Sequence, residues 1–143
     1  MSNKIKLKIV TPEKVIFEGE VEEIIVPSMQ GEMGVLPDHE PLLAALSVGE
    51  MRIKKANNWD HFALMGGFIE VRPESNVRIL ANSAEHAEDI DEARAMEAKQ
   101  KAEKILTERK EDVSFADASG ALERSLSRLK VAQRKRKHKG KGY

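Results

Sequence analysis

Residues 76–98, NVRILANSAEHAEDIDEARAMEA, join two different sequence patterns. The first six residues, NVRILA, are one of several short apolar runs bounded by turn residues, which is typical of β-strands. From residue 85 onward alanines become frequent, β-branched residues nearly vanish, and Glu and Lys interleave, which favours a helix. The chain therefore changes from β to α structure here, and we expect a first domain over 1–84 and a second over 85–143.

The first domain carries the patterns of short strands. In KIKLKIV, residues 4–10, the apolar Ile5, Leu7 and Ile9 alternate with lysines, as in a strand with one buried face. Further apolar runs lie at 15–19, 21–28, 42–49, 51–56, 61–71 and 76–81. Between them, segment 27–46 combines glycines and prolines, which indicates an irregular, stiff loop. The spacing of the runs predicts an antiparallel β-sandwich.

The second domain carries two apolar stripes with helical spacing. The first stripe comprises Ala95, Ala98, Ala102, Ile105 and Leu106. After a break at 111–115, the second comprises Phe115, Ala118, Leu122, Leu126 and Leu129. Two helices joined by a short loop are expected to pair as an antiparallel hairpin. Because each stripe is thin, we expect the hairpin to dock on the sandwich or on a partner, and to exchange one for the other.

Segment 88–95, EDIDEARA, has two interpretations. As a helix start, Asp89 and Glu92 form a D-x-x-E capping pattern, and acidic residues suit the positive end of the helix dipole. As a small-molecule site, Asp91 and Arg94 are three residues apart and project side by side from a helix. Taken alone, the segment leaves both interpretations open.

The composition excludes several classes of function. The 143 residues include no cysteine, which rules out disulfides, thiolate metal sites and cysteine nucleophiles. The N-terminus lacks a signal-peptide pattern, and no apolar run is long enough to span a bilayer. The four histidines are never spaced as helix ligand pairs, and no nucleophile–base or phosphate-loop motif is present. We therefore expect a protein that is not an enzyme and binds no metal.

Charge is distributed unevenly along the chain. Residues 1–84 carry 9 Lys and Arg against 12 Asp and Glu, whereas residues 85–143 carry 15 against 12. After Glu123 there are 9 basic residues and no acidic ones. This basic segment predicts an acidic partner, which could be nucleic acid, lipid or another protein. Only Tyr143 supplies an aromatic ring among these charges, so the segment offers little for base stacking.

Five segments are typical of one known family: VPSMQGEMGVLPDHEPLLAAL (26–46), GEMRIK (49–54), FALMGGFIEV (62–71), VRILANSAE (77–85) and DIDEARAMEAKQKAE (89–103). In this order they resemble the epsilon subunits of bacterial F-type ATP synthases, over essentially the whole chain. The resemblance implies a ten-stranded N-terminal β-sandwich and a C-terminal two-helix hairpin. It also implies a rotor subunit that binds the gamma subunit and the c-subunit ring, with Glu32 approaching the c ring and His39 near gamma.

The resemblance further implies a conformational switch. The hairpin folded on the sandwich would permit activity, and the hairpin extended along gamma would inhibit ATP hydrolysis. In the extended state, the basic face of the second helix would meet an acidic segment of a beta subunit. Such a protein would be peripheral to the membrane through its complex, at the cytoplasmic face of the bacterial plasma membrane. The alternative from another class is a stand-alone nucleic-acid-binding module that uses the basic C-terminal segment.

Some members of this family bind ATP as a regulatory ligand through an I/L-D-x-x-R-A motif, and the chain contains this motif. By resemblance, the ATP-binding residues are Glu85, Ile90, Asp91, Arg94, Ala95, Arg124 and Arg128. Arginine side chains suit phosphate oxygens, and a carboxylate can accept from an adenine amino group or a ribose hydroxyl. Arg124 and Arg128 could bind ATP, could bind the acidic beta segment, or could bind the two at different times. Participation of Mg²⁺ is open.

Overall fold

The computed structural model describes residues 4–107 and 113–140, with side chains over 4–107 and 116–134. The chain divides into two compact units, Met1–His86 and Ala87–Tyr143. The division lies two residues beyond the boundary expected from composition. The reason is that residues 84–86 pair with the sheet as a short strand, although their sequence already resembles that of a helix.

The first unit is built from eight strands in its described part. They are β1 (Ile5–Val10), β2 (Val15–Val21), β3 (Glu23–Ser28), β4 (Gly31–Val35), β5 (Leu42–Lys55), β6 (Asn58–Arg72), β7 (Asn76–Ala81) and β8 (Ala84–His86). Hydrogen bonds connect them in the order β2-β1-β7-β6-β5-β3-β4, and β8 pairs with β6. All pairs are antiparallel except β1 with β7, which run parallel.

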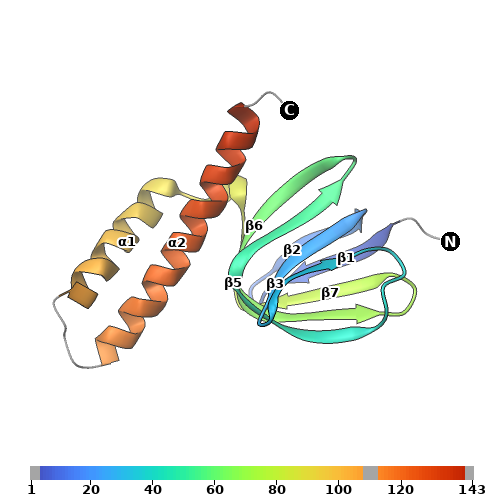
Figure 1. Ribbon diagram of the computed structural model, residues 1–143, viewed down its shortest axis with the longest axis horizontal. Helices are drawn as coiled ribbons and strands as arrows, with labels where there is room; N and C mark the ends of the chain where they lie inside the picture. Colours follow the sequence, from blue (N-terminus) through green and yellow to red (C-terminus); the bar gives the residue numbers. More distant parts are fainter. Residues whose placement is uncertain (1–3, 108–112, 141–143) are drawn as a thin grey trace. The chain divides into compact units, whose positions relative to one another are not determined.

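The long strands β5 and β6 run through both layers of a sandwich (Figure 1). One layer contains β2, β1, β7, residues 67–72 of β6 and the start of β5. The other layer contains β3, β4, β8 and the remaining parts of β5 and β6. The pairing of β5 with β6 keeps one register on both sides of the fold, with Leu46 opposite Gly67 and Val48 opposite Met65. Gly67 has φ +134°, and a Cβ there would lie 2.1 Å from the carbonyl oxygen of Leu80, so only glycine fits.

The core lies between the two layers. In β1, Ile5, Leu7 and Ile9 are fully buried while the lysines between them point outward, which confirms the predicted period of two. Inward residues of β3, β5, β6 and β7 join the same cluster, including the fully buried Phe62 and Ile69. Burial of each large aliphatic or aromatic side chain contributes about 1.5–3 kcal/mol relative to exposure.

The sandwich prediction is confirmed, and several of its details change. Residues 31–35, expected to be part of a loop, form β4, because Gly34 and its neighbours pair with β3 in an extended conformation. The runs 42–49 and 51–56, expected to be separate, form the single strand β5. The described part has eight strands where the resemblance implied ten, because β5 and β6 each pass through both layers without interruption.

The second unit is a helical hairpin. A short 3-10 helix, η1 (Ala87–Asp89), precedes α1 (Glu92–Thr107) and α2 (Val113–Gly140), and the two α-helices pack side by side (Figure 1). Small buried residues recur at intervals of seven, namely Ala95 and Ala102 on α1, and Ala118, Ser125 and Ala132 on α2, and α2 also buries the larger Leu129 and Val131. Small residues at this spacing keep to one face of a helix and permit close approach of the two backbones.

The inward face of α2 differs from the predicted stripe. Leu126 is 46% exposed, whereas its polar neighbour Ser125 is 1% exposed. Ala98 of the first stripe is also exposed, and the side chain of Phe115 lies outside the described ones. Close packing against alanines selects the small Ser125 for the interface and turns the larger Leu126 outward.

Candidate functional site

Asp91 is the N-cap residue of α1. Its Oδ1 accepts a hydrogen bond from the backbone N–H of Arg94 at 3.1 Å, and its carbonyl oxygen accepts from Ala95 N–H at 3.0 Å. This geometry satisfies donors that have no partner within the first turn of a helix. The capping prediction for Asp89 with Glu92 is wrong by two residues, because Asp89 belongs to η1 and α1 begins only at Glu92.

The structure divides the predicted ATP-binding residues between the two units. Glu85 lies on β8, in the sandwich unit, opposite Ala63 of β6. The other residues lie in the helical unit, with Asp91 and Arg94 exposed at the start of α1. Ala95 is buried, so it contributes packing and its side chain does not reach the surface. Ile90 is half-buried in the short connection between η1 and α1.

Within the helical unit, antiparallel pairing brings the start of α1 level with Arg124 and Arg128. Arg94 is 13 residues before the end of α1 at Thr107, and Leu126 is 13 residues after the start of α2 at Val113. Contacts between η1 and α2 support the same register. Arg124 is exposed and Arg128 is half-buried. The two arginines therefore flank the level of Arg94, an arrangement suited to an anionic ligand.

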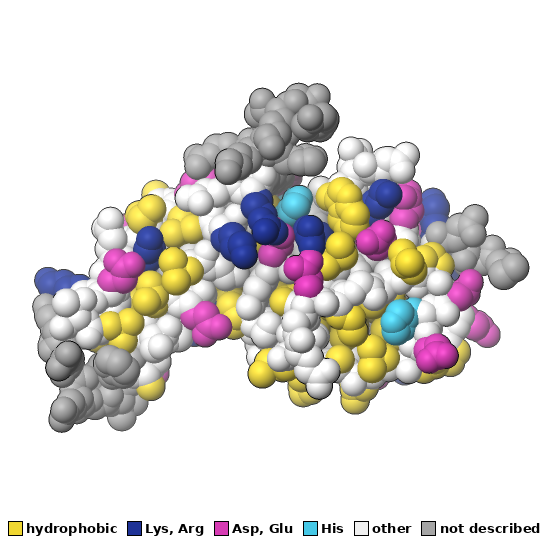
Figure 2. All heavy atoms as spheres, in the orientation of Figure 1, with side chains coloured by type: hydrophobic (Ala, Val, Ile, Leu, Met, Phe, Trp, Pro, Cys, Tyr) yellow, Lys and Arg dark blue, Asp and Glu magenta, His cyan; other side chains and the backbone are white. Residues whose placement is uncertain are grey.

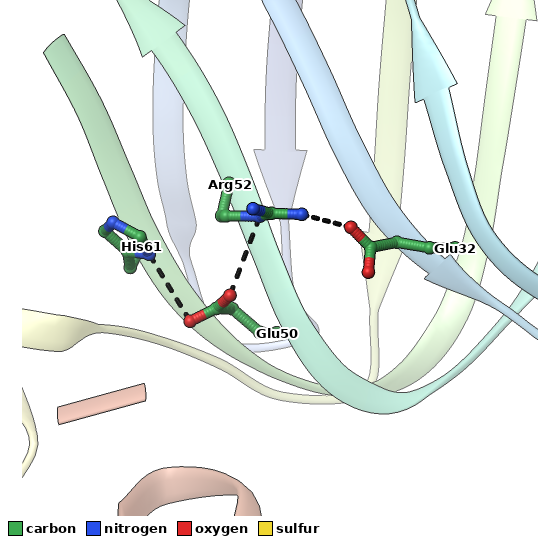
Figure 3. A network of polar contacts seen from close by, with 4 residues as sticks. All are labelled: Glu32, Glu50, Arg52 and His61. Carbon is green, nitrogen blue, oxygen red and sulfur yellow. Dashed lines mark hydrogen bonds and ion pairs between the residues drawn. The ribbon is translucent and has the colours of Figure 1, made fainter. Parts of the chain in front are cut away.

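Glu32 belongs to a charged network that extends over β4, β5 and β6 (Figure 3). The Glu50 side chain is only 7% exposed and lies between two bases, with Arg52 Nε at 3.6 Å and His61 Nδ1 at 3.3 Å. Arg52 also forms an ion pair with Glu32, whose side chain is 60% exposed. Arg52 thus links a buried carboxylate to an exposed one, and Glu32 is held in place at the surface.

The sequence reasoning did not identify Glu50, Arg52 and His61 as a group. Glu50 and Arg52 are two residues apart on β5, and that spacing puts them on the same face of a strand. This spacing is the only local signal, because the pairing of Arg52 with His61 depends on the register of β5 with β6.

His39 lies in the connection between β4 and β5, and a neighbouring turn holds this connection. The backbone N–H of Asp38 donates to Ser75 Oγ at 2.8 Å, and Ser75 is buried in the turn between β6 and β7. His39 Nδ1 is 2.7 Å from the carbonyl oxygen of Glu40, and the backbone N–H of His39 donates to the carbonyl oxygen of Leu36. The loop therefore presents His39 from a defined backbone conformation.

An apolar row crosses the outer face of one sandwich layer. Strand register places Ala45, Phe68, Leu80, Val10 and Val15 next to one another on β5, β6, β7, β1 and β2. Phe68 is 52%, Leu80 44% and Val15 50% exposed. We call these five residues the apolar row. Figure 2 shows hydrophobic side chains at the surface of the sandwich among charged ones. Contiguous exposed apolar side chains of this kind mark a surface that another molecule covers.

Comparison with known proteins identifies the family. Residues 4–87 match the family "ATP synthase, Delta/Epsilon chain, beta-sandwich domain", and residues 88–133 match "ATP synthase, Delta/Epsilon chain, long alpha-helix domain". The chain belongs to the delta/epsilon-chain family of ATP synthases. Its relatives named ATP synthase epsilon chain include that of Dehalococcoides mccartyi, 44% identical over 94% of this chain and 96% of the relative. The relative from Syntrophobacter fumaroxidans is 46% identical over 94% and 99%.

Solved structures support the assignment. A chain in the cryo-EM structure of the Euglena gracilis mitochondrial ATP synthase, OSCP/F1/c-ring, superimposes with a TM-score of 0.76. It is 26% identical, and the match covers 86% of this chain and 78% of that one. A chain of the Tetrahymena thermophila mitochondrial ATP synthase shares the fold at 14% identity and a TM-score of 0.56, over 92% and 95% of the two chains.

Family membership confirms the resemblance drawn from the sequence, and with it a role as a subunit of an ATP synthase. The comparisons do not support the nucleic-acid-binding alternative. Much of the basic segment on which that alternative depended lies outside the described side chains, from residue 135 onward. Among the described residues, no helix is long and apolar enough to cross a membrane. The roles of Glu32, His39 and the ATP-binding residues stay predictions.

Proposed function

We propose that the chain is the non-catalytic central-stalk subunit of a bacterial ATP synthase, in which it binds gamma and the c ring. The observation that carries this proposal is the apolar row, because register aligns apolar side chains of five strands on one outer face, and three of them are large and exposed. Covering such a row removes apolar area from water and stabilises a complex at about 25 cal/mol per Å². We assign the row to gamma.

The contact with the c ring is assigned to the end of the sandwich that carries Glu32 on β4, and His39, in the connection from β4 to β5, is assigned to gamma. Support comes from the similar chain in the Euglena gracilis structure, whose description includes the c ring. The ion pair between Glu32 and Arg52, and the hydrogen bond from Asp38 N–H to Ser75 Oγ, hold β4 and the loop that follows it in one conformation before binding. Preorganised loops lose little conformational entropy on association, as expected of a subunit that transmits torque.

The helical hairpin is the regulatory part of this proposal. Ala and Ser supply five of the seven described buried residues of α1 and α2, and the other two are Leu129 and Val131, so separating the helices exposes a limited apolar area. An extended arrangement along gamma is then accessible at modest cost. In that arrangement Arg124, Arg128, Lys130 and Arg134 of α2 would meet an acidic segment of a beta subunit and inhibit ATP hydrolysis. The complex places the chain at the cytoplasmic face of the plasma membrane, where it is peripheral.

ATP is proposed as the ligand that biases the hairpin. Arg94, Arg124 and Arg128 would bind the phosphates, and the Asp91 carboxylate retains acceptor capacity beyond its capping bond to Arg94 N–H. Glu85 and Ile90 would complete the site when the hairpin is folded, and Mg²⁺ can accompany the phosphates. A ligand shifts this equilibrium only by its difference in affinity for the two arrangements.

Binding to the catalytic head tests the proposal. The cognate head with gamma, prepared without this subunit, is titrated with the full chain and with Phe68→Asp. We expect the wild type to bind and Phe68→Asp to bind at least about tenfold more weakly, because the charge cannot be buried without cost. Glu13→Gln, in the exposed turn between β1 and β2, is the control for a surface substitution. Equal binding by Phe68→Asp and wild type excludes the row as the gamma contact.

A further inference from the structure

The guanidinium of Arg52 is shared between a buried and an exposed carboxylate (Figure 3). Its Nε lies 3.6 Å from Glu50 Oε1, and a terminal nitrogen forms the ion pair with Glu32. The Glu50 side chain is buried and the Glu32 side chain is exposed, so the two carboxylates compete for one cation on unequal terms. Water screens an exposed ion pair more than a buried one. Glu50 is therefore the stronger competitor for Arg52.

A second base, His61, contacts the other oxygen of Glu50. His61 Nδ1 is 3.3 Å from Glu50 Oε2, and strand register puts His61 directly opposite Arg52. In the part of the chain that the structure describes, Arg52 Nε is buried and has no hydrogen-bond acceptor, because Glu50 Oε1 lies beyond the usual length of about 2.9 Å. The Glu50 carboxylate is thus closer to His61 than to Arg52 Nε, and this position lets the guanidinium reach Glu32.

His61 is the member of this network whose charge responds to pH near neutrality. Histidine changes its charge between about pH 5 and 8, whereas carboxylate, lysine and arginine side chains ordinarily keep theirs. The other charged side chains on this face of the layer are Glu23 on β3, Lys54 on β5 and Glu85 on β8. With His61 protonated, the network of Glu32, Glu50, Arg52 and His61 holds two positive and two negative charges. With His61 neutral, one positive charge serves two carboxylates.

We propose that the charge of His61 decides how firmly Arg52 holds Glu32. With His61 protonated, both bases serve Glu50, and Arg52 keeps its ion pair with Glu32. When His61 loses its proton, only Arg52 of the two bases is charged, so its Nε moves toward the buried Glu50 and its ion pair with Glu32 weakens. Glu32 is therefore held at low pH and released as the pH rises through the titration of His61.

This pH-sensitive clamp regulates the surface that Glu32 presents. Taking the c ring as the partner at this surface rests on the proposed function, and Glu32 is then better preorganised for the ring below neutral pH than above it. The clamp is a property of the free chain and is tested without a partner. Its failure therefore leaves the proposed function standing, and failure of the binding of the chain to the catalytic head leaves the clamp to its own measurement.

A nuclear magnetic resonance titration of the full chain tests the proposal. The carboxyl-carbon shift of Glu32 and the ring-proton shifts of His61 are followed from about pH 5.5 to 8.5, and we expect both to change with one midpoint. The variant Arg52→Gln supplies the shift of Glu32 without its guanidinium partner, from which the paired fraction follows. We expect the ratio of paired to unpaired Glu32 to fall roughly two- to fivefold as His61 loses its proton, which is the size of an exposed ion pair.

Two further variants should abolish the pH dependence with opposite results for Glu32. His61→Gln never carries the positive charge, so Glu32 should stay in its released state at every pH. Glu50→Gln removes the buried carboxylate, so no described carboxylate competes for Arg52 and Glu32 should stay held at every pH. Glu50→Gln also keeps the proposal testable if His61→Gln does not fold.

The matched control is His86→Gln. The His86 ring packs edge-on against Phe62 and its Nε2 is 3.7 Å from Asp60, on the opposite face of β6 from His61, so the Glu32 titration should keep its wild-type form. A common midpoint for Glu32 and His61 that both network variants abolish supports the proposal. A Glu32 shift that stays constant over this pH range, or a dependence that persists in His61→Gln or in Glu50→Gln, overturns it.

Discussion

Two substitutions at Asp91 separate its capping role from its proposed role in ATP binding. Asp91→Ala removes the side-chain acceptor of the Arg94 N–H and also the negative charge. Asp91→Ser keeps an oxygen that can cap the helix but lacks the carboxylate. Both variants are therefore expected to weaken the affinity for ATP, and only Asp91→Ala is expected to lower the stability of the helix.

The magnitudes follow from the two interactions. Loss of an N-cap side chain costs about 1 kcal/mol, so Asp91→Ala should lower the melting temperature of the helical unit and Asp91→Ser should not. Loss of a hydrogen bond from a charged group costs about 1.5–3 kcal/mol, which corresponds to roughly a 10- to 150-fold weaker ATP affinity in both variants. Asp89→Ala, which changes an exposed acidic residue of η1, should alter neither property.

Three assays check this prediction. Calorimetric titration of the full chain with ATP, with and without Mg²⁺, gives the affinities. Thermal unfolding followed by far-ultraviolet circular dichroism gives the stability, and hydrogen exchange at the Arg94 amide reports the cap directly. If Asp91→Ser binds ATP as the wild type does, the carboxylate has no part in binding and Asp91 is a capping residue alone.

Three further substitutions test the packing. Gly67→Ala should lower the free energy of unfolding by about 3 kcal/mol or more, because a Cβ would clash with the backbone of Leu80. Gly34→Ala should lower it by less than about 1 kcal/mol, because a Cβ there enters open space. Denaturant titration measures both free energies. Arg52→Ala removes the guanidinium beside the buried Glu50 carboxylate and should cost about 1–3 kcal/mol, against less than about 0.5 kcal/mol for Glu32→Gln. Equal losses would refute the role of the buried carboxylate. Ser125→Leu should destabilise the hairpin by about 1–3 kcal/mol through overpacking, while Leu126→Ser should change its stability by less than about 0.5 kcal/mol. A larger effect at Leu126 would contradict the burial of Ser125 in the interface between the helices.

Local patterns in the sequence predicted the elements better than the contacts between them. The alternation of Ile5, Leu7 and Ile9 with lysines revealed a half-buried strand, because that pattern depends only on neighbouring residues. The need for glycine at position 67 was hidden inside a continuous apolar run, because it comes from the backbone of Leu80 on another strand. The apolar row could not be predicted for the same reason, because it depends on the register of strands far apart in sequence.

The helical unit shows a second limit. Hydrophobicity alone favoured Leu126 for the interface, but packing against alanines buries Ser125 instead. The helix start was recognised within two residues, and Asp91 rather than Asp89 became the cap because η1 occupies 87–89. The candidate ATP-binding residues came from resemblance, and counting from the ends of α1 and α2 puts the level of Arg94 between those of Arg124 and Arg128.

The rate of ATP hydrolysis by the cognate catalytic head with gamma tests the division of labour most directly. The head is saturated either with the full chain or with a chain that ends at His86, the last residue of the sandwich unit. We predict that both chains join the complex and that only the full chain inhibits hydrolysis. Failure of the shorter chain to bind, or equal hydrolysis rates with the two chains bound, would contradict a sandwich that docks and a hairpin that regulates.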